Sequence, residues 1–240
     1  KGGYREAMTR DWQPIADMRL SDKDANTSKT MNTHLHIIEP YTNLLRVWGD
    51  TELREATTSL LELFFDKIEA SGKRGHLGLF FDDDWNRLDG IISYGHDIEA
   101  SWLLLETAQV LDDKALLDKA TAHTGRIAEA ALEGRCADGS MVYERHESGA
   151  YDNDKHWWVQ AENVIGQMYL YLFHGREDML GKAYDSWSYI RDYIVDGEGG
   201  EWFWSRSNGK ADRTQDKAGF WKCPYHNSRM CLEVYEHLHQ

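Results

Sequence analysis

The chain has 240 residues, of which 41 are acidic and 27 are basic, so its formal net charge is −14. This balance argues against a nucleic-acid partner, because phosphate binding requires a basic surface. Hydrophobic residues make up 41% of the chain and charged residues 28%, which is typical of a globular domain. No apolar run approaches the roughly 20 residues of a membrane span. Without a signal peptide either, the sequence predicts a cytoplasmic protein with no membrane partner.

Three residue types stand out in the composition. The three cysteines (Cys136, Cys223 and Cys231) are too few for a disulfide framework, which also favours a reducing compartment. The ten tryptophans and eleven histidines are many for this length.

Short runs rich in glycine and aromatic residues recur along the chain, at 3–12, 76–85, 139–145 and 201–206. Each predicts a short strand or hairpin. The first two share an Asp-Trp pair followed by an amide side chain. The acidic run 82–84 is expected to be a solvated hairpin tip, with a calcium site as the weaker alternative.

Helical segments fill the spaces between these runs. They are predicted in pairs over 30–48 with 52–70, 95–111 with 113–132 and 157–174 with 177–194, and one further helix is predicted near 225–239. The first helix of each pair is apolar nearly all round, whereas the second is amphipathic. A buried inner helix backed by a half-exposed outer helix explains this difference.

Comparable positions on the inner helices lie about 60 to 70 residues apart, at His36, His96, Trp158 and His226. This period suits a repeated unit of a helical hairpin and a β-hairpin. The fold class that we predict is all-α, an (α/α)6 toroid or barrel whose inner helices line a central cavity. A linear α-solenoid is the alternative, but the concentration of aromatic residues and histidines on the inner segments favours the toroid.

Each inner helix begins with the same kind of chemistry, a histidine or tryptophan followed by a carboxylate or amide. The residues that form these groups are Asn32 with His36, His96 with Glu99, Trp158 with Glu162, and Trp221 followed by His226. Spacings of three or four place the first three pairs on one helix face. Helix N-termini disfavour imidazolium, so a histidine buried there is expected to stay neutral and to act as a base.

Simpler interpretations exist for each of these residues. A lone histidine or tryptophan on an inner helix is usually a core residue, and Glu162 could be a solvated helix charge. Aromatic rings in an acidic protein are also the usual platforms for sugar rings. His34 and His36 do not face each other, and the chain has none of the common metal-ligand, Walker A or dinucleotide-binding motifs, so no metal or cofactor is expected.

Four segments of the chain resemble the N-acylglucosamine 2-epimerase superfamily, and within it the cellobiose 2-epimerase group. The segments are 29–36, 93–99, 157–162 and 219–227. They follow one another in the same order as in the family and span essentially the whole chain. The related acylglucosamine epimerases and mannose isomerases usually carry His-Pro before the glycine of the second segment, where this chain has Ser93-Tyr94.

The resemblance implies a twelve-helix (α/α)6 barrel and an isomerase that needs no metal or redox cofactor. It implies that His96 and His226 exchange the C2 proton of a ring-opened, cellobiose-like disaccharide through an enediolate, which interconverts glucose-type and mannose-type ends. His36 matches a histidine associated with ring opening. The remaining matches are expected to bind the sugar or support the histidines: Asn32, Glu99, Trp157, Trp158, Glu162 and Trp221.

One departure from the family is visible in the sequence. Seven helices can be predicted rather than twelve, and an arginine and a tyrosine of the family site have no counterpart. We therefore expect the chain to be a single barrel domain that is incomplete at its N-terminus, with an open apolar wall that favours oligomerisation. The open alternatives are an N-acylglucosamine epimerase, an aldose–ketose isomerase, an inverting glycosidase and a non-catalytic sugar- or protein-binding domain.

Overall fold

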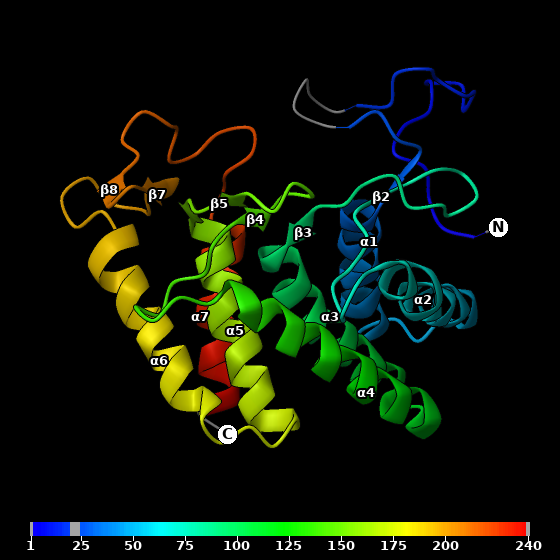
Figure 1. Cartoon of the computed structure of the whole chain (residues 1–240). Helices are drawn as coiled ribbons and strands as arrows, with labels where there is room; N and C mark the ends of the chain where they lie inside the picture. The colour runs from blue at the N-terminus through cyan, green and yellow to red at the C-terminus, as the bar shows by residue number, and fades with distance from the viewer. Residues whose placement is uncertain (1, 20–24, 239–240) are drawn as a thin grey trace. The chain divides into compact units, whose positions relative to one another are not determined.

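A computed structural model of the chain describes residues 2–19 and 25–238. The chain forms two compact units, one of residues 1–92 with 103–124 and the other of residues 93–102 with 125–240. Figure 1 shows a chain that is mostly helical, with short strands between the helices. The all-α class predicted from the sequence is confirmed, as is the alternation of helices with short antiparallel strands.

The first unit contains helices α1 (Met31–Leu45) and α2 (Thr51–Leu63), and the latter continues as a π-helical turn, η1 (Phe64–Glu69). The side chains of Thr30 and Asp50 cap the two helices by accepting hydrogen bonds from the amides of Thr33 and Leu53. Strands β1 (Lys29–Thr30) and β2 (Phe80–Phe81) pair antiparallel. The polar caps explain why both helices begin within one or two residues of the predicted positions.

Helices α3 (Tyr94–Leu111) and α4 (Lys114–Ala131) each contribute residues to both units, and α4 is followed by a short 3₁₀ turn, η2 (Leu132–Gly134). The side chain of Asp113 accepts a hydrogen bond from the amide of Leu116 and thereby caps α4. Both helices lie within two residues of their predicted spans.

The second unit is built around α5 (Trp157–Phe173), which packs against α6 (Met179–Tyr189) and α7 (Tyr225–Leu238). A π-helical turn, η3 (Ile190–Ile194), extends α6. Every residue of α5 from 157 to 170 is buried, whereas α6 and α7 are buried along one face only. This is the difference between inner and outer helices that the hydrophobic pattern predicted for the α5–α6 pair.

The strands of the second unit are short. Strand β3 (Ile92–Ser93) leads into α3, and β4 (Glu144–Arg145) pairs antiparallel with β5 (Tyr151–Asp152). Strand β6 (Lys155–His156) pairs with β7 (Ser205–Ser207), which pairs in turn with β8 (Lys210–Ala211).

The β7–β8 hairpin has a two-residue loop, Asn208-Gly209. Both residues have positive φ, at 49° and 75°. Two consecutive left-handed residues are what a type I′ hairpin turn requires, and an Asn-Gly pair adopts them readily.

The predicted strand or hairpin at 3–12 is wrong, because among the described residues of that run none belongs to a strand. The carboxylate of Glu6 instead accepts hydrogen bonds from the amide and hydroxyl of Thr30 and from the hydroxyl of Thr33. The segment is therefore bound to the start of α1 through a side chain rather than through strand pairing. Trp12 and Trp85 still share a left-handed backbone, with φ of 59° and 67°.

The acidic run at 82–84 lies in the turn that follows β2. The carboxylate of Asp82 accepts hydrogen bonds from the amide of Asp84 and from the amide and side chain of Asn86, and Asp83 binds Arg5. These bonds lower the pKa of Asp82, first through the side chain of Asn86. The acidic side chains thus stabilise the turn and an ion pair, which fits the predicted hairpin tip.

Within the described residues, every helix falls short of the length and apolarity that a membrane crossing needs.

Candidate active site

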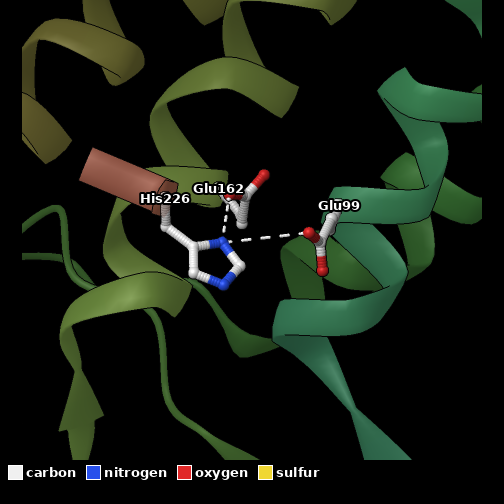
Figure 2. A group of neighbouring side chains, drawn as sticks. All are labelled: Glu99, Glu162 and His226. Carbon is white, nitrogen blue, oxygen red and sulfur yellow. Dashed lines mark hydrogen bonds and ion pairs between the residues drawn. The ribbon is translucent and has the colours of Figure 1, made fainter. Parts of the chain in front are cut away.

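A buried cluster of two carboxylates, an imidazole and a guanidinium lies in the second unit. Glu99 comes from α3, Glu162 from α5, and His226 and Arg229 from the first turns of α7. Figure 2 shows that the side chains of Glu99, Glu162 and His226 converge from these three helices. Both carboxylates are at most 1% exposed, so their charges must be balanced inside the protein.

Glu162 uses both of its carboxylate oxygens within the protein. Its Oε1 accepts hydrogen bonds from Nδ1 of His226 at 2.7 Å and from Nη2 of Arg229 at 2.8 Å, and its Oε2 accepts one from Nε1 of Trp102 at 2.9 Å. Burial pushes the pKa of Glu162 upward, but the charge of Arg229 and the bond from His226 outweigh it. The pKa of this carboxyl therefore lies below its ordinary value, and Glu162 is ionised.

Arg229 binds the second carboxylate through the same nitrogen. Its Nη2 donates to Oε1 of Glu99 at 2.7 Å, while Oε2 of Glu99 is buried and has no hydrogen-bond partner among the described residues. The guanidinium also lies over the rings of Trp102 and Tyr225, at 4.9 and 4.3 Å. Arg229 thus supplies the positive charge that allows two buried carboxylates to lie side by side.

The bond to Glu162 determines which nitrogen of His226 is available for chemistry. An ionised carboxylate can only accept, so Nδ1 carries a hydrogen and the neutral ring has its lone pair on Nε2. In Figure 2 this second nitrogen points away from both carboxylates. The side chain is 15% exposed, and no described residue is found bonded to Nε2. His226 is thereby prepared to accept a proton at Nε2.

His96 lies near the start of α3 in a different environment. Its Nδ1 is 2.8 Å from the hydroxyl of Ser93, and its ring packs against Trp158 with the centroids 4.7 Å apart. A hydroxyl can donate or accept, so either tautomer of His96 keeps this bond. The ring of His226 lies 5.5 Å from the same Trp158. One tryptophan thus contacts both imidazoles, of which one has a fixed tautomer and the other does not.

Gly95 makes the position of Trp158 possible. A Cβ atom at residue 95 would lie 2.6 Å from Cη2 of Trp158, closer than any ordinary contact. Trp158 also meets Tyr143 edge to face at 6.1 Å. The glycine of the predicted second segment therefore leaves room for the aromatic ring that contacts both imidazoles.

Trp157, the neighbour of Trp158, faces another group of residues. Its ring lies 4.6 Å from Trp204 and 6.4 Å from His226, and its buried Nε1 has no hydrogen-bond partner among the described residues. Trp221 contacts Phe220 edge to face and is 47% exposed. Of the predicted aromatic residues, Trp157 and Trp158 contact the buried cluster, whereas Trp221 lies in the loop before α7.

Asn32 and His36 belong to the first unit, on α1. Asn32 is exposed, and His36 is half-buried with Nδ1 3.7 Å from Glu39. His34, which was not expected to bind a metal, is fully buried. Its Nδ1 donates to the carbonyl of Thr30 and its Nε2 accepts from the amide of Tyr4. Both of its nitrogens are used, so His34 is a structural residue, and burial lowers its pKa to about 4.

Glu99, Glu162 and His226 each offer a ligand atom, and these three atoms lie within 4.8 Å of one another. A divalent cation at this place would meet Arg229, whose nitrogen already binds both carboxylates. The donor set is therefore better matched to a guanidinium than to a metal ion.

Arg229 and Trp102 bind the buried carboxylates, and neither was predicted from the sequence. Arg229 follows His226 by three positions and Trp102 follows Glu99 by three, so each lies on the same helix face as a predicted site residue. A spacing of three residues from a predicted site residue is therefore the sequence pattern that could have indicated them.

Two imidazoles and two buried carboxylates thus lie near the starts of helices in a mostly helical scaffold. The chain belongs to the N-acylglucosamine 2-epimerase (GlcNAc 2-epimerase) family, which it matches over residues 4–229.

Among curated proteins, the cellobiose 2-epimerase of Bacteroides fragilis is 53% identical over 236 residues, which cover 98% of this chain and 60% of that protein. Among solved structures, the cellobiose 2-epimerase of Spirochaeta thermophila matches with a TM-score of 0.89 and 39% identity over 98% of this chain and 59% of its own. A sugar epimerase from a ruminal bacterium matches with a TM-score of 0.92 and 34% identity over 98% of this chain and 60% of its own.

These matches confirm the predicted family and the (α/α)6 fold class. The chain spans about 60% of the length of these relatives.

Proposed function

We propose that the chain carries the proton-transfer site of a sugar 2-epimerase, which interconverts glucose-type and mannose-type reducing ends of a β-1,4-linked disaccharide. The observation that carries the proposal is the pair of imidazoles of His96 and His226 against one tryptophan, Trp158. Inversion at a carbon needs a base on one face and an acid on the other, and near pH 7 an imidazole can serve as the base when neutral and as the acid when protonated. The disaccharide is suggested by the relatives that are cellobiose 2-epimerases.

In the proposed reaction one imidazole takes the proton from C2 of the ring-opened sugar, and an enediolate forms. After a bond rotation the other imidazole, which enters the step as imidazolium, donates its proton to the opposite face of C2. One C–H bond breaks and one forms, and the product is an isomer of the substrate, so the step consumes no oxidant or reductant. His226 acts at Nε2, because Glu162 holds its Nδ1 hydrogen.

The other predicted residues complete the proposal. Arg229 supports His226 through Glu162, and Glu99 binds Arg229. Trp157, Trp158 and Trp221 offer aromatic faces for sugar rings. His36 is proposed to assist ring opening, and Asn32 to bind a sugar hydroxyl.

Hydrogen exchange at C2 tests the proposal directly. The chain, and the longest form in which the protein is expressed, is incubated in D2O with cellobiose, N-acetylglucosamine or mannose, and C2 is followed by NMR. Deuterium at C2 of cellobiose together with its C2 epimer is the expected result.

Other outcomes identify the alternatives. Exchange on N-acetylglucosamine alone indicates an acylglucosamine epimerase, a ketose product indicates an isomerase, and free glucose from cellobiose indicates a glycosidase. A folded protein that exchanges C2 of no sugar refutes the proposed activity and leaves a binding role.

A further inference from the structure

Lys222 is a buried charge that the proposed reaction does not use. It is 1% exposed and lies in the loop 212–224, between β8 and α7. Its Nζ donates to Oε1 of Glu201 at 3.2 Å, to the carbonyl of Trp202 at 2.7 Å and to the carbonyl of Lys217 at 2.9 Å. All three ammonium hydrogens therefore have acceptors, which is the condition for burying a lysine at an acceptable cost.

Glu201 ties the same loop to the first turn of α7. Its Oε1, which accepts from Lys222, also accepts from Nδ2 of Asn227 at 2.9 Å. Glu201 has a φ of 60°, a left-handed conformation that is unfavourable for a residue with a side chain. One carboxylate oxygen thus binds the residue after Trp221 and the residue after His226.

A second lysine binds the loop to the turn that precedes Glu201. Nζ of Lys217 donates to the carbonyl of Gly200 at 2.8 Å and binds the buried carboxylate of Asp196. The amide of Gly219 donates to the carbonyl of Lys222 at 2.8 Å, which closes the loop on itself. Between these fixed points the loop exposes Trp221 to solvent at 47%.

We propose that Lys222 and Glu201 form a clamp that positions Trp221 and His226 for the sugar. The clamp holds Lys222, which directly follows Trp221, and Asn227, which directly follows His226. Lys222 also lies over the ring of Trp157, at 5.5 Å, and Trp157 contacts His226. A methionine in place of Lys222 would fill a similar volume without the cost of a buried charge. The ammonium of Lys222 is therefore explained by the loop conformation that its three hydrogen bonds hold in place. The role of the clamp in sugar binding rests on the proposed function, whereas the clamp itself does not.

The clamp is tested first without any sugar, by amide hydrogen exchange with mass spectrometry. The compared proteins are the wild type, Lys222→Met, Glu201→Gln as a milder second variant, and Lys210→Met as a control at an exposed lysine of β8. Loss of charged hydrogen bonds should speed exchange in the loop 212–224 by about tenfold or more in Lys222→Met. Exchange in α5 should be unchanged. Loop exchange equal to that of the control, or an equal rise in α5, overturns the clamp.

The positioning role is tested by separating KM from kcat with cellobiose as the substrate. A misplaced Trp221 weakens binding of the sugar and a displaced His226 slows proton transfer, so Lys222→Met should raise KM about fivefold or more and lower kcat as well. A merely destabilised protein would lose active enzyme, which lowers kcat and leaves KM unchanged. An unchanged KM in a variant whose loop exchange is faster overturns the positioning role. If the wild type epimerises no sugar, the proposed function fails, and the exchange measurement still decides whether the clamp exists.

Discussion

Replacing Arg229 by methionine removes the guanidinium that binds both Glu99 and Glu162. The two carboxylate oxygens lie within 4.8 Å of each other, and both side chains are at most 1% exposed. Two unit charges at that distance repel by about 3.5 kcal/mol at an effective dielectric constant of about 20. Removing one partner of a buried ion pair typically costs about 3–5 kcal/mol. We therefore expect the free energy of unfolding to fall by about 3–5 kcal/mol.

Urea denaturation at pH 7 measures this loss, with Arg191→Met as a control at an exposed arginine that pairs with its neighbour Asp192. The control should change the free energy of unfolding by less than about 0.5 kcal/mol. Adding Glu99→Gln to Arg229→Met removes one of the two charges, so it should restore about 2 kcal/mol or more of the loss.

The pH dependence gives an independent check with a defined sign. In the wild type the pKa of Glu162 is lowered, so this carboxyl contributes stability above its unfolded pKa that is lost as the pH falls. Without Arg229, burial and the second carboxylate raise the pKa of Glu162 instead. Lowering the pH from 7 to 5 should therefore narrow the difference in unfolding free energy between Arg229→Met and the wild type. An unfolding free energy for Arg229→Met within about 1 kcal/mol of the wild type, or no recovery on adding Glu99→Gln, would refute the role of Arg229.

Three further predictions concern the imidazoles and the residues that shape their surroundings. His96→Ala and His226→Ala should each lower the rate of C2 exchange by about a hundredfold or more while circular dichroism stays unchanged, and normal turnover in either variant contradicts the paired assignment. Gly95→Ala should displace Trp158, because the added Cβ would lie 2.6 Å from its ring; the expected cost is about 1–3 kcal/mol in urea denaturation, and a cost near zero contradicts the packing argument. Burial lowers the pKa of His34 to about 4, below an unfolded value near 6.5, so the unfolded state takes up a proton at a higher pH than the folded state does. The free energy of unfolding of the wild type should therefore fall by about 3 kcal/mol as the pH falls from 6.5 to 4. His34→Gln should weaken this dependence, and an identical pH profile would show that other groups cause it.

Local signals in the sequence were enough to predict the elements of the fold. The hydrophobic periodicity of the inner and outer helices and the caps at Thr30 and Asp50 act over a few residues, so the predicted helices lie within a few residues of the observed ones. The predicted end of the last helix at 239 lies outside the described residues. The run 3–12 failed because its bonds go to the start of α1 through Glu6, and a side-chain contact across more than 20 residues has no local pattern.

The candidate site was predicted in part for the same reason. His96, Glu99, Trp158, Glu162 and His226 are recognisable because each begins a helix with similar chemistry in a repeated unit. This repetition alone placed acid–base residues on successive inner helices.

Only the tertiary structure decided how these residues are connected. Arg229 binds Glu99 across 130 positions of sequence, and His226 binds Glu162 across 64. Such pairs form because the first part of α3 lies in the same unit as α5 and α7, and the need to neutralise two buried carboxylates then selects the partner. The sequence by itself determined which helices carry the chemistry; the packing of α3, α5 and α7 decided which nitrogen of His226 is free and which cation holds the carboxylates together.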